Sequence, residues 1–265
     1  DSLALSKEAA RTEADIIIQC GVHFMAETSK ILSPNKMVLV PDLDAGCSLA
    51  DSCPPKDFEQ FIKRHPDHIV ISYINCSTEV KELSDIICTS SNAFRIINSL
   101  PKEQKIVFGP DKNLGAYLAR ESGRELVLWD GVCIVHQEFS EQEILSLKRK
   151  YPNSKLVAHP ACTSYVLDYA DFIGSTTAML EFIKTDSATT YIVATEACLL
   201  HQMKKNSPEK KFLPAPVVST CSACNQCPYM QINTLEKLYK CMKEESPEIL
   251  IDEKLRLRAY QSVQK

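Results

Sequence analysis

The stretch SDIICTSSNAFRIINSL, residues 84–100, contains one complete step from strand to helix. An acid precedes a short apolar run, which is typical of a buried strand, and a turn follows. Phe94, Ile97 and Leu100 then recur at helical spacing, so we expect them on one apolar face of a helix. The stretch therefore predicts a β-then-α unit.

The pattern recurs as ADIIIQCGVHFMAETSKIL at residues 14–32 and as ADFIGSTTAMLEFIK at 170–184, so the chain contains an internal repeat. Copies two and three are each preceded by one strand and helix and followed by two further strands. These flanking strands are HIVISYIN (68–75), KIVFGP (105–110), ELVLWD (125–130), KLVAHP (155–160), TYIVAT (190–195) and KFLPAP (211–216). Short strands that alternate with helices indicate parallel sheets, because parallel neighbours cannot be joined by a tight hairpin.

The sequence thus predicts an α/β fold of three similar three-layer domains, with parallel sheets in a pseudo-threefold arrangement around a central site. The expected units are residues 1–55, 56–138 and 139–231, and a C-terminal helix at 232–265 is expected to pack with the first. The first unit opens with a helix at residues 2–14 and no strand before it. A unit without this strand would leave the main-chain groups at one sheet edge unpaired, so we expect that an opening strand is missing. The alternative is a natural two-stranded unit.

Composition favours a globular protein that acts on small molecules. The chain has 265 residues, 45% of them hydrophobic, and its formal charge of -4 is spread among interspersed acids and bases. No stretch approaches the roughly 18 apolar residues of a membrane span, and the first residues lack a signal pattern, so we expect a soluble protein. No basic stripe is available to nucleic acid, and no GxGxxG or P-loop motif indicates a nucleotide site.

Ten of the twelve cysteines fall into two groups. One group lies within or beside apolar runs and is expected to pack as small hydrophobic side chains: Cys20, Cys76, Cys88, Cys162 and Cys198. In addition, the last strand of each unit leads into a cysteine-bearing loop. These loop residues are Cys47 in the first unit, Cys133 in the second, and Cys221, Cys224 and Cys227 in the third.

The three loops can converge, because ligands of open α/β sheets collect at the carboxyl ends of the strands. Three thiolates at one point would form a metal site with a vacant position. A four-iron cluster held in this way leaves one iron free to bind substrate oxygen as a Lewis acid. Two alternatives for the third loop are a zinc knuckle, and a dithiol or disulfide of Cys221 and Cys224 beside a cluster-bound Cys227.

Most of the chain resembles the quinolinate synthase family, block by block and in the same order. The segments that carry the resemblance are VPDLDAGCSLADSCP (40–54), SYINCSTEVKELSDIICTSSNA (72–93), FGPDKNLGAYL (108–118), GVCIVHQEF (131–139), AHPACTSYVLDYADFIGSTTAM (158–179) and CPYMQINTLEKL (227–238). The family's fold is three α/β domains around a 4Fe-4S cluster with one cysteine ligand from each domain. The resemblance implies Cys47, Cys133 and Cys227 as these ligands.

The family condenses iminoaspartate with dihydroxyacetone phosphate and eliminates water to give quinolinate, the pyridine precursor of NAD. The resemblance therefore implies these two small molecules as substrates. It also implies an aspartate-oxidising partner enzyme that supplies iminoaspartate, and a location in the cytoplasm, or in the plastid of a plant or alga.

The family's active-site tyrosine and asparagine fall on Tyr73 and Asn75 at a strand end, where they would orient and protonate a carbonyl-bearing intermediate. His136 and His159 are expected to donate hydrogen bonds near the free iron. Without the resemblance, Tyr73 reads as a core aromatic residue and each histidine as a structural one.

Hydroxyl groups at helix starts are expected to hold a phosphate or a dicarboxylate. Ser90, Ser175 and Thr176 stand where strand meets helix, although ordinary helix caps would explain the same positions. Ser2 belongs to a DSL block that matches another anion-binding serine of the family.

The sequence departs from the family's pattern in three ways. Ala161 stands where the family has the glutamate of an HPE motif, so a carboxylate that would act on the intermediate is missing and full activity is in doubt. The family carries a further active-site histidine and tyrosine in an opening segment, which is not found here. Cys198 stands where glycine is expected.

Two other functions use the same cysteines. One is a different open-cluster hydro-lyase, which removes water from a hydroxy acid. The other is a non-enzymatic iron-sulfur or redox sensor, which would have no substrate-sized polar pocket beside its cluster.

Overall fold

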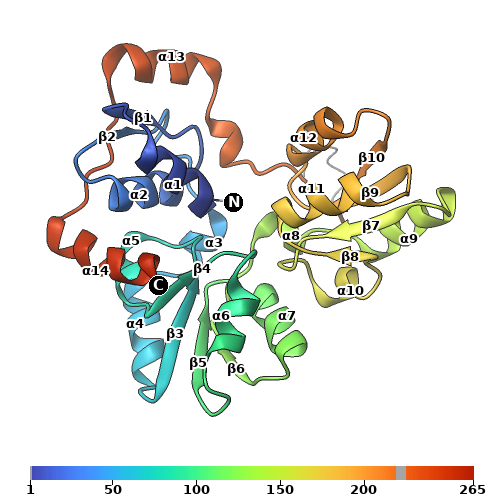
Figure 1. The fold of residues 1–265 in the computed structure, drawn as a ribbon, viewed down its shortest axis with the longest axis horizontal. Helices are drawn as coiled ribbons and strands as arrows, with labels where there is room; N and C mark the ends of the chain where they lie inside the picture. The colour runs from blue at the N-terminus through green and yellow to red at the C-terminus, as the bar shows by residue number, and fades with distance from the viewer. Residues whose placement is uncertain (1, 219–224) are drawn as a thin grey trace.

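A computed structural model describes residues 2–218 and 225–265. Within these ranges the strands form three parallel sheets, and Figure 1 shows the three units grouped around the centre of the molecule. The prediction of an α/β fold with three parallel-sheet units is confirmed.

The second and third units have the same strand order, in which the first strand lies between the second and the third. The middle sheet runs β4 (Ile86–Cys88), β3 (His68–Tyr73), β5 (Lys105–Gly109), β6 (Leu126–Leu128). The other runs β8 (Phe172–Ile173), β7 (Lys155–Ala158), β9 (Thr190–Ala194), β10 (Lys211–Pro214). Each sheet is therefore built by helical crossovers between parallel strands, as the alternating pattern predicts.

Helices cover both faces of the middle sheet (Figure 1). Successive residues of a strand point to opposite sides, and here both sides carry apolar residues that need a cover. The helices are α4 (Pro55–Lys63), α5 (Thr78–Glu82), α6 (Ala93–Ser99) and α7 (Lys112–Ser122). Val70 and Val107 pack in the core that includes Phe58 of α4. Their chain neighbours Ile71 and Phe108 pack in the other core, with α6 and α7.

The expected apolar face of the α6 segment is partly wrong. Ile97 is fully buried, but Phe94 is 46% exposed and Leu100 lies beyond the end of the helix. The buried pair is Ala93 and Ile97, four residues apart, and Phe94 follows the first of these by one position and so turns outward.

The short α8 (Ile134–Gln137) ends the second unit, and the third unit adds the helices α9 (Glu141–Lys150), α10 (Ser164–Leu167), α11 (Thr176–Thr185) and α12 (Leu199–Asn206). Its strands contribute a core in which Val157, Tyr191 and Val193 are fully buried. Such continuous burial is expected for parallel strands covered on both faces.

The first unit contains α1 (Ser2–Arg11), β1 (Ile16–Ile18), α2 (His23–Leu32), β2 (Met37–Leu39) and the short α3 (Ser48–Asp51). β1 pairs directly with β2, with Ile17 opposite Val38. In the other units the first strand pairs in this way with the second and the third with the fourth, but only the fourth leads into a cysteine-bearing loop, as β2 does. β1 thus corresponds to β5 and β9, and α1 corresponds to α6 and α11.

The expected equivalence of Asp15 with the other two repeat acids is therefore wrong. The carboxylate of Asp85 accepts a hydrogen bond from the N–H of Val70 at 2.8 Å, and Asp171 accepts one from Leu156 at 2.7 Å, so each acid joins its second strand to its first. Asp15 instead accepts, through its main-chain carbonyl, from Met37 N–H at 3.0 Å. The opening strand expected before α1 stays a prediction.

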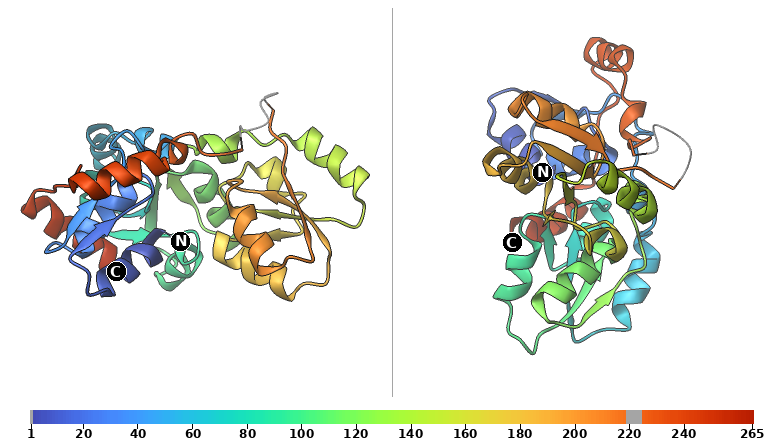
Figure 2. Two further views of the ribbon diagram at one scale, coloured as in Figure 1. Left: turned by 90° about the horizontal axis from the view of Figure 1, so that it is seen from above. Right: turned by 90° about the vertical axis from the view of Figure 1, so that its right-hand side faces the viewer.

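The segment 232–265 is two helices rather than one, α13 (Leu235–Glu244) and α14 (Glu253–Gln264), after the short 3-10 helix η1 (Met230–Ile232). Figures 1 and 2 show α13 on the outer side of the first unit. Residues 247–249 then run beside β2, where Ile249 N–H donates to the carbonyl of Val38 at 2.8 Å.

α14 joins the first two units. The hydroxyl of Ser262 donates to the carbonyl of Lys81 in α5 at 2.7 Å, and the guanidinium of Arg256 donates to the carbonyl of Ile31 in α2 at 3.1 Å. No helix in the described part of the chain is long and apolar enough to cross a membrane.

Candidate active site

A cavity of about 380 Å³ lies where residues of the three units meet. All but one of the residues predicted for the site line it: Ser2, Cys47, Tyr73, Asn75, Ser90, Cys133, His136, His159, Thr176 and Cys227. The exception is Ser175. The roles assigned to these residues stay predictions, but the convergence of their positions is a property of the fold.

The three thiols come from equivalent places. Cys47 follows β2 at the start of α3, Cys133 follows β6 at the start of α8, and Cys227 lies beyond β10. The N–H of Ile134 donates to Ser48 Oγ at 3.4 Å and so ties the first two loops together.

Enclosure in the protein makes these thiols hard to ionise. Burial raises the pKa of Cys47 to about 12 and that of Cys133 to about 11, and burial also raises the pKa of Cys227. The charge of Cys133 raises the pKa of Cys47 and of Cys227 further. Thiolates in this cavity therefore need a bound cation, and three of them are a donor set that fits an iron-sulfur cluster.

A single ion fits less well. Among residues 2–218 and 225–265, no three histidine, cysteine or acidic side chains stand close enough together to hold one metal ion. A tetrahedral zinc site would require sulfurs about 2.3 Å from one point. A cluster spreads its thiolates over several irons, and so suits ligands that come from three separate loops. The proposed dithiol of Cys221 and Cys224 lies outside the described residues.

The two histidines stack on each other in neutral form. Their ring centroids are 4.6 Å apart, with 21° between the planes. Burial lowers the pKa of His136 to about 4 and holds the pKa of His159 well below its ordinary value. Nδ1 of His159 accepts from the N–H of Ala161 at 3.2 Å, which leaves the proton of the neutral ring on Nε2 as a donor.

The two ring nitrogens of His136 differ in their surroundings. Nε2 lies 3.1 Å from the hydroxyl of Thr195, while Nδ1 is buried and has no hydrogen-bond partner in the described structure. A buried nitrogen without a hydrogen-bond partner costs folding free energy. Nδ1 of His136 is therefore better explained as a group that pairs with a ligand or a water than as a packing group.

Tyr73 and Asn75 enter from the end of β3. The hydroxyl of Tyr73 is hydrogen-bonded to Ser90, and burial raises the pKa of Tyr73 far above its ordinary value. The phenol is therefore a proton donor throughout the physiological range. Oδ1 of Asn75 is buried without a partner among the described residues, so it is available to accept from a ligand.

Three hydroxyl groups lie at or just before the starts of corresponding helices in the three units. Ser2 begins α1, Ser90 precedes α6, and Thr176 begins α11. Ser175 instead caps α11, where its Oγ accepts from the N–H of Ala178 at 3.2 Å. Because no Lys or Arg is found among the described residues that line the cavity, an anion there would be bound by neutral donors.

Sequence reasoning missed Thr195 and Glu196, which follow β9 and line the cavity. One carboxylate oxygen of Glu196 accepts from the N–H of Cys198 at 2.8 Å, and the other accepts from the N–H of Cys227 at 3.2 Å. The available signal was their place directly after the third strand of a unit, where ligands collect.

The expected burial of the cysteines beside apolar runs is wrong for two of the five. Cys76, Cys88 and Cys162 are buried as predicted, but Cys20 and Cys198 are exposed. Both follow a strand end rather than lying within it, so the apolar run beside them does not enclose them. Cys198 lines the cavity.

Ala161 lies behind the cavity wall. Its side chain is 1% exposed and belongs to the core on the α6 and α7 side of the middle sheet, against which Tyr73 also packs. Its carbonyl accepts from the side-chain amide of Asn113 at 3.2 Å, which joins the third unit to the second.

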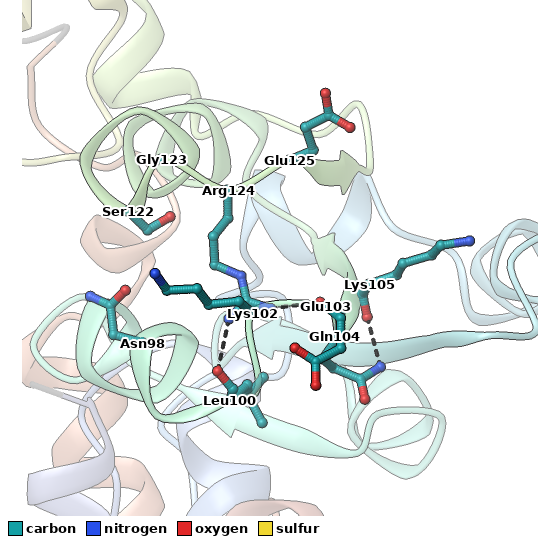
Figure 3. Close-up of a pocket in the computed structure, with 10 residues that line it drawn as sticks. All are labelled: Asn98, Leu100, Lys102, Glu103, Gln104, Lys105, Ser122, Gly123, Arg124 and Glu125. Carbon is teal, nitrogen blue, oxygen red and sulfur yellow. Dashed lines mark hydrogen bonds between the residues drawn. The ribbon is translucent and has the colours of Figure 1, made fainter.

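A second hollow, of about 470 Å³, is structural (Figure 3). It lies between residues 98–105 and 122–125 on the middle unit. The guanidinium of Arg124 donates to four main-chain carbonyls, those of Ile97, Leu100, Pro101 and Gln104. Its charge therefore holds two loops together and is not free for an anion.

Comparison with known proteins agrees with this geometry. The family model described as quinolinate synthetase A protein matches residues 1–265. Relatives named quinolinate synthase include those of Microcystis aeruginosa (60% identical), Chloroherpeton thalassium (58%) and Synechocystis sp. (57%). Each aligns over the whole of this chain, which spans 83%, 82% and 83% of their respective lengths. The chain therefore belongs to the quinolinate synthetase A family of enzymes.

Proposed function

We propose that this enzyme is a quinolinate synthase, which condenses iminoaspartate with dihydroxyacetone phosphate and removes water to give quinolinate for NAD biosynthesis. The observation that carries the proposal is that thiols, imidazoles, a phenol and hydroxyls from all three units line one cavity. An aspartate-oxidising enzyme would supply the unstable imine.

Cys47, Cys133 and Cys227 would hold a 4Fe-4S cluster. The iron without a thiolate would supply Lewis-acid chemistry to a substrate oxygen. Burial supports this assignment, because the raised pKa of Cys47, about 12, disfavours a free thiolate and leaves the metal to provide the compensating charge.

The neutral side chains would orient the substrates. The phenol of Tyr73 and the Nε2–H of His159 donate hydrogen bonds toward carbonyl oxygens, while Oδ1 of Asn75 accepts from an amine or hydroxyl. Protonated groups with strongly shifted pKa values suit a reaction in which oxygens leave as water.

The hydroxyls of Ser2, Ser90 and Thr176 would hold the phosphate and carboxylate groups at three sides of the cavity. This arrangement matches two anionic substrates that must lie side by side. Neutral donors bind an anion without fixing it as tightly as an ion pair, which favours release of the doubly charged product.

Ala161 would make this enzyme a slow one. The cavity's lining carboxylate, Glu196, is held by the main-chain N–H groups of Cys198 and Cys227, so it is not free to approach a substrate. A proton-transfer group expected at position 161 is thus not replaced by that carboxylate.

Anaerobic reconstitution with iron and sulfide tests the proposal. About four irons per chain, together with quinolinate formation from the two substrates, are expected, and the Cys20→Ala variant is the matched control because Cys20 is exposed and does not line the cavity. One zinc without sulfide would refute the cluster. A full cluster that dehydrates hydroxy acids but forms no quinolinate would favour the hydro-lyase alternative.

A further inference from the structure

We propose that Cys198 is a fourth thiol of the cavity, and that it occupies the coordination position left open by the other three cysteines when no ligand is bound. The inference rests on the proposed function, since it concerns the same cluster. It assigns to this chain a self-blocking ligand that a substrate must displace.

The first observation is the position of the thiol. Cys198 precedes α12 and lines the same cavity as Cys47, Cys133 and Cys227. It is exposed rather than packed in a core, so hydrophobic burial does not account for it. Four thiols therefore face one cavity from four loops.

The second observation is how the Cys198 loop is held. The carboxylate of Glu196 accepts from the N–H groups of both Cys198 and Cys227, at 2.8 and 3.2 Å. The N–H of Ala197 also donates to the carbonyl of Asn225 at 3.0 Å. Two loops that are about 30 residues apart in sequence are thereby fixed to each other, and Cys198 is fixed beside Cys227.

The exposure of Cys198 also accounts for its proton. The S–H proton passes to solvent when the sulfur binds iron, and the sulfur is protonated again from solvent when an oxygen ligand displaces it.

Thiolates are strong ligands for the irons of a cluster, whereas substrates offer oxygen. Occupancy of the open position by Cys198 would reduce the apparent affinity for an oxygen ligand in proportion to the fraction of open sites. If Cys198 is bound in about nine molecules of ten, removing it tightens ligand binding about tenfold.

Alkylation of the cluster-loaded protein tests the inference. The anaerobic protein is treated with N-ethylmaleimide, and each cysteine is followed by mass spectrometry in apo protein, loaded protein, and loaded protein with malate as an oxygen-ligand probe. We expect Cys198 to react at least about tenfold more slowly after loading, and to regain reactivity with malate. Cys20, also exposed, should react equally in all three states.

The Cys198→Ser variant provides the second readout, with Cys20→Ser as its control. We expect the Cys198→Ser protein to bind malate about tenfold more tightly, and its reduced cluster to give a changed electron paramagnetic resonance spectrum before malate is added. Unchanged reactivity of Cys198 on loading would overturn the inference. Protection of Cys198 in the wild type, together with identical spectra for wild type and Cys198→Ser, would also overturn it. In that case the cluster would shield the thiol sterically without being bound by its sulfur.

The two proposals fail in different ways. A chain that assembles no iron and sulfide would overturn the proposed function and this inference together. A cluster that survives with Cys198 freely reactive would overturn this inference alone and leave the proposed function standing.

Discussion

The second and third units place a carboxylate at the same position and use it differently. Asp111 is the second residue after β5, and Glu196 is the second residue after β9. Asp111 is fully buried and its Oδ1 accepts from the N–H of Leu114 at 2.9 Å, so it caps α7. Glu196 lines the cavity and holds two cysteine loops.

The difference comes from the loop that follows each strand. α7 begins immediately after Asp111, which draws this carboxylate to the helix start, whereas α12 begins only at Leu199 and leaves Glu196 outside the helix. The sheet therefore fixes where a functional group stands, and the length of the next loop fixes whether it serves the fold or the site.

The largest expected effect tests whether the two units contribute equivalently to the cluster. Cys133→Ala and Cys227→Ala should each abolish the cluster absorbance of the anaerobically reconstituted protein, and Cys47→Ala should do the same for the first unit. Two thiolates are too few to hold four irons against chelation. Retention of the full cluster in Cys47→Ala would contradict a ligand from the first unit. Loss with Cys221→Ala or Cys224→Ala, but not with Cys227→Ala, would move the third ligand.

The next effect concerns the loops after the first strands. Ala161 holds the position in the third unit that Asn75 holds in the second. In each unit the residue lies three positions after the last residue of the first strand that pairs with the third strand; that residue is Ala158 in the third unit and Ser72 in the second. Ala161→Glu should raise the rate of quinolinate formation by about 10²- to 10⁴-fold, because it supplies a positioned carboxylate, and should change substrate affinity much less.

Ala161→Gln is the matched control for that change, since it has the same size and no carboxylate. Both side chains are larger than the buried alanine, so each variant should lose about 1–3 kcal/mol of unfolding free energy. Steady-state kinetics and urea unfolding measure the two effects separately. Equal rates for wild type and Ala161→Glu would exclude a role for a carboxylate here.

A smaller effect is the pH dependence of the unfolding free energy, which tests the buried carboxylate of Asp111. Burial raises the pKa of Asp111 from 3.8 to about 6, so the folded state holds the proton more tightly and loses stability as pH rises through this range. The loss amounts to roughly 3 kcal/mol above about pH 7, because a tenfold difference in proton affinity between the folded and unfolded states is worth about 1.4 kcal/mol. Asp111→Asn, which keeps a capping oxygen, should be more stable than wild type at pH 7.5 and not at pH 4.

Glu196→Gln is the counterpart, because this side chain is not enclosed in the core. The same urea-unfolding profile between pH 4 and 7.5 is measured for it, as the matched carboxylate-to-amide change at the equivalent position. An Asp111→Asn profile parallel to that of the wild-type apo protein would show that the buried carboxylate is not the source of the pH dependence.

The smallest effect compares the repeat acids. Asp85→Ala and Asp171→Ala each remove a carboxylate that accepts a main-chain N–H, and each should cost about 1–2 kcal/mol. Asp171 also pairs with Lys148 at 2.8 Å, which adds about 0.2–1 kcal/mol. Urea unfolding at low and high salt should show the difference between the two variants shrinking as salt rises.

Local pattern was enough to predict much of the fold and part of the site. The strands and most helices follow from apolar runs and helical spacing, and Cys47 and Cys133 follow from their places after the last strands of their units. Tyr73 is assigned by the family resemblance, because its sequence pattern alone reads as a core aromatic residue. The match of Asp15 to Asp85 failed because an acid before an apolar run does not specify which strand will pair with it.

Residues whose role depends on distant loops could not be predicted. Glu196 acquires its function by accepting from Cys227, about 30 residues later, and no local pattern encodes that contact. The burial of Ala161 likewise depends on docking between the second and third units. Exposure of Phe94 depends on the residue at which α6 begins, and helix boundaries are set by caps and tertiary packing.

The position of α14 has a consequence for how the molecule is made. The ribosome completes α2 and α5 long before it reaches Ser262 and Arg256, which bind their carbonyls. At about 5–20 residues per second, the 180 residues from Glu82 at the end of α5 to Ser262 take roughly 9–36 seconds to synthesise. The nascent chain therefore carries uncovered apolar surface on α5 during that interval, and premature termination near the 3′ end of the message would leave that surface exposed for good.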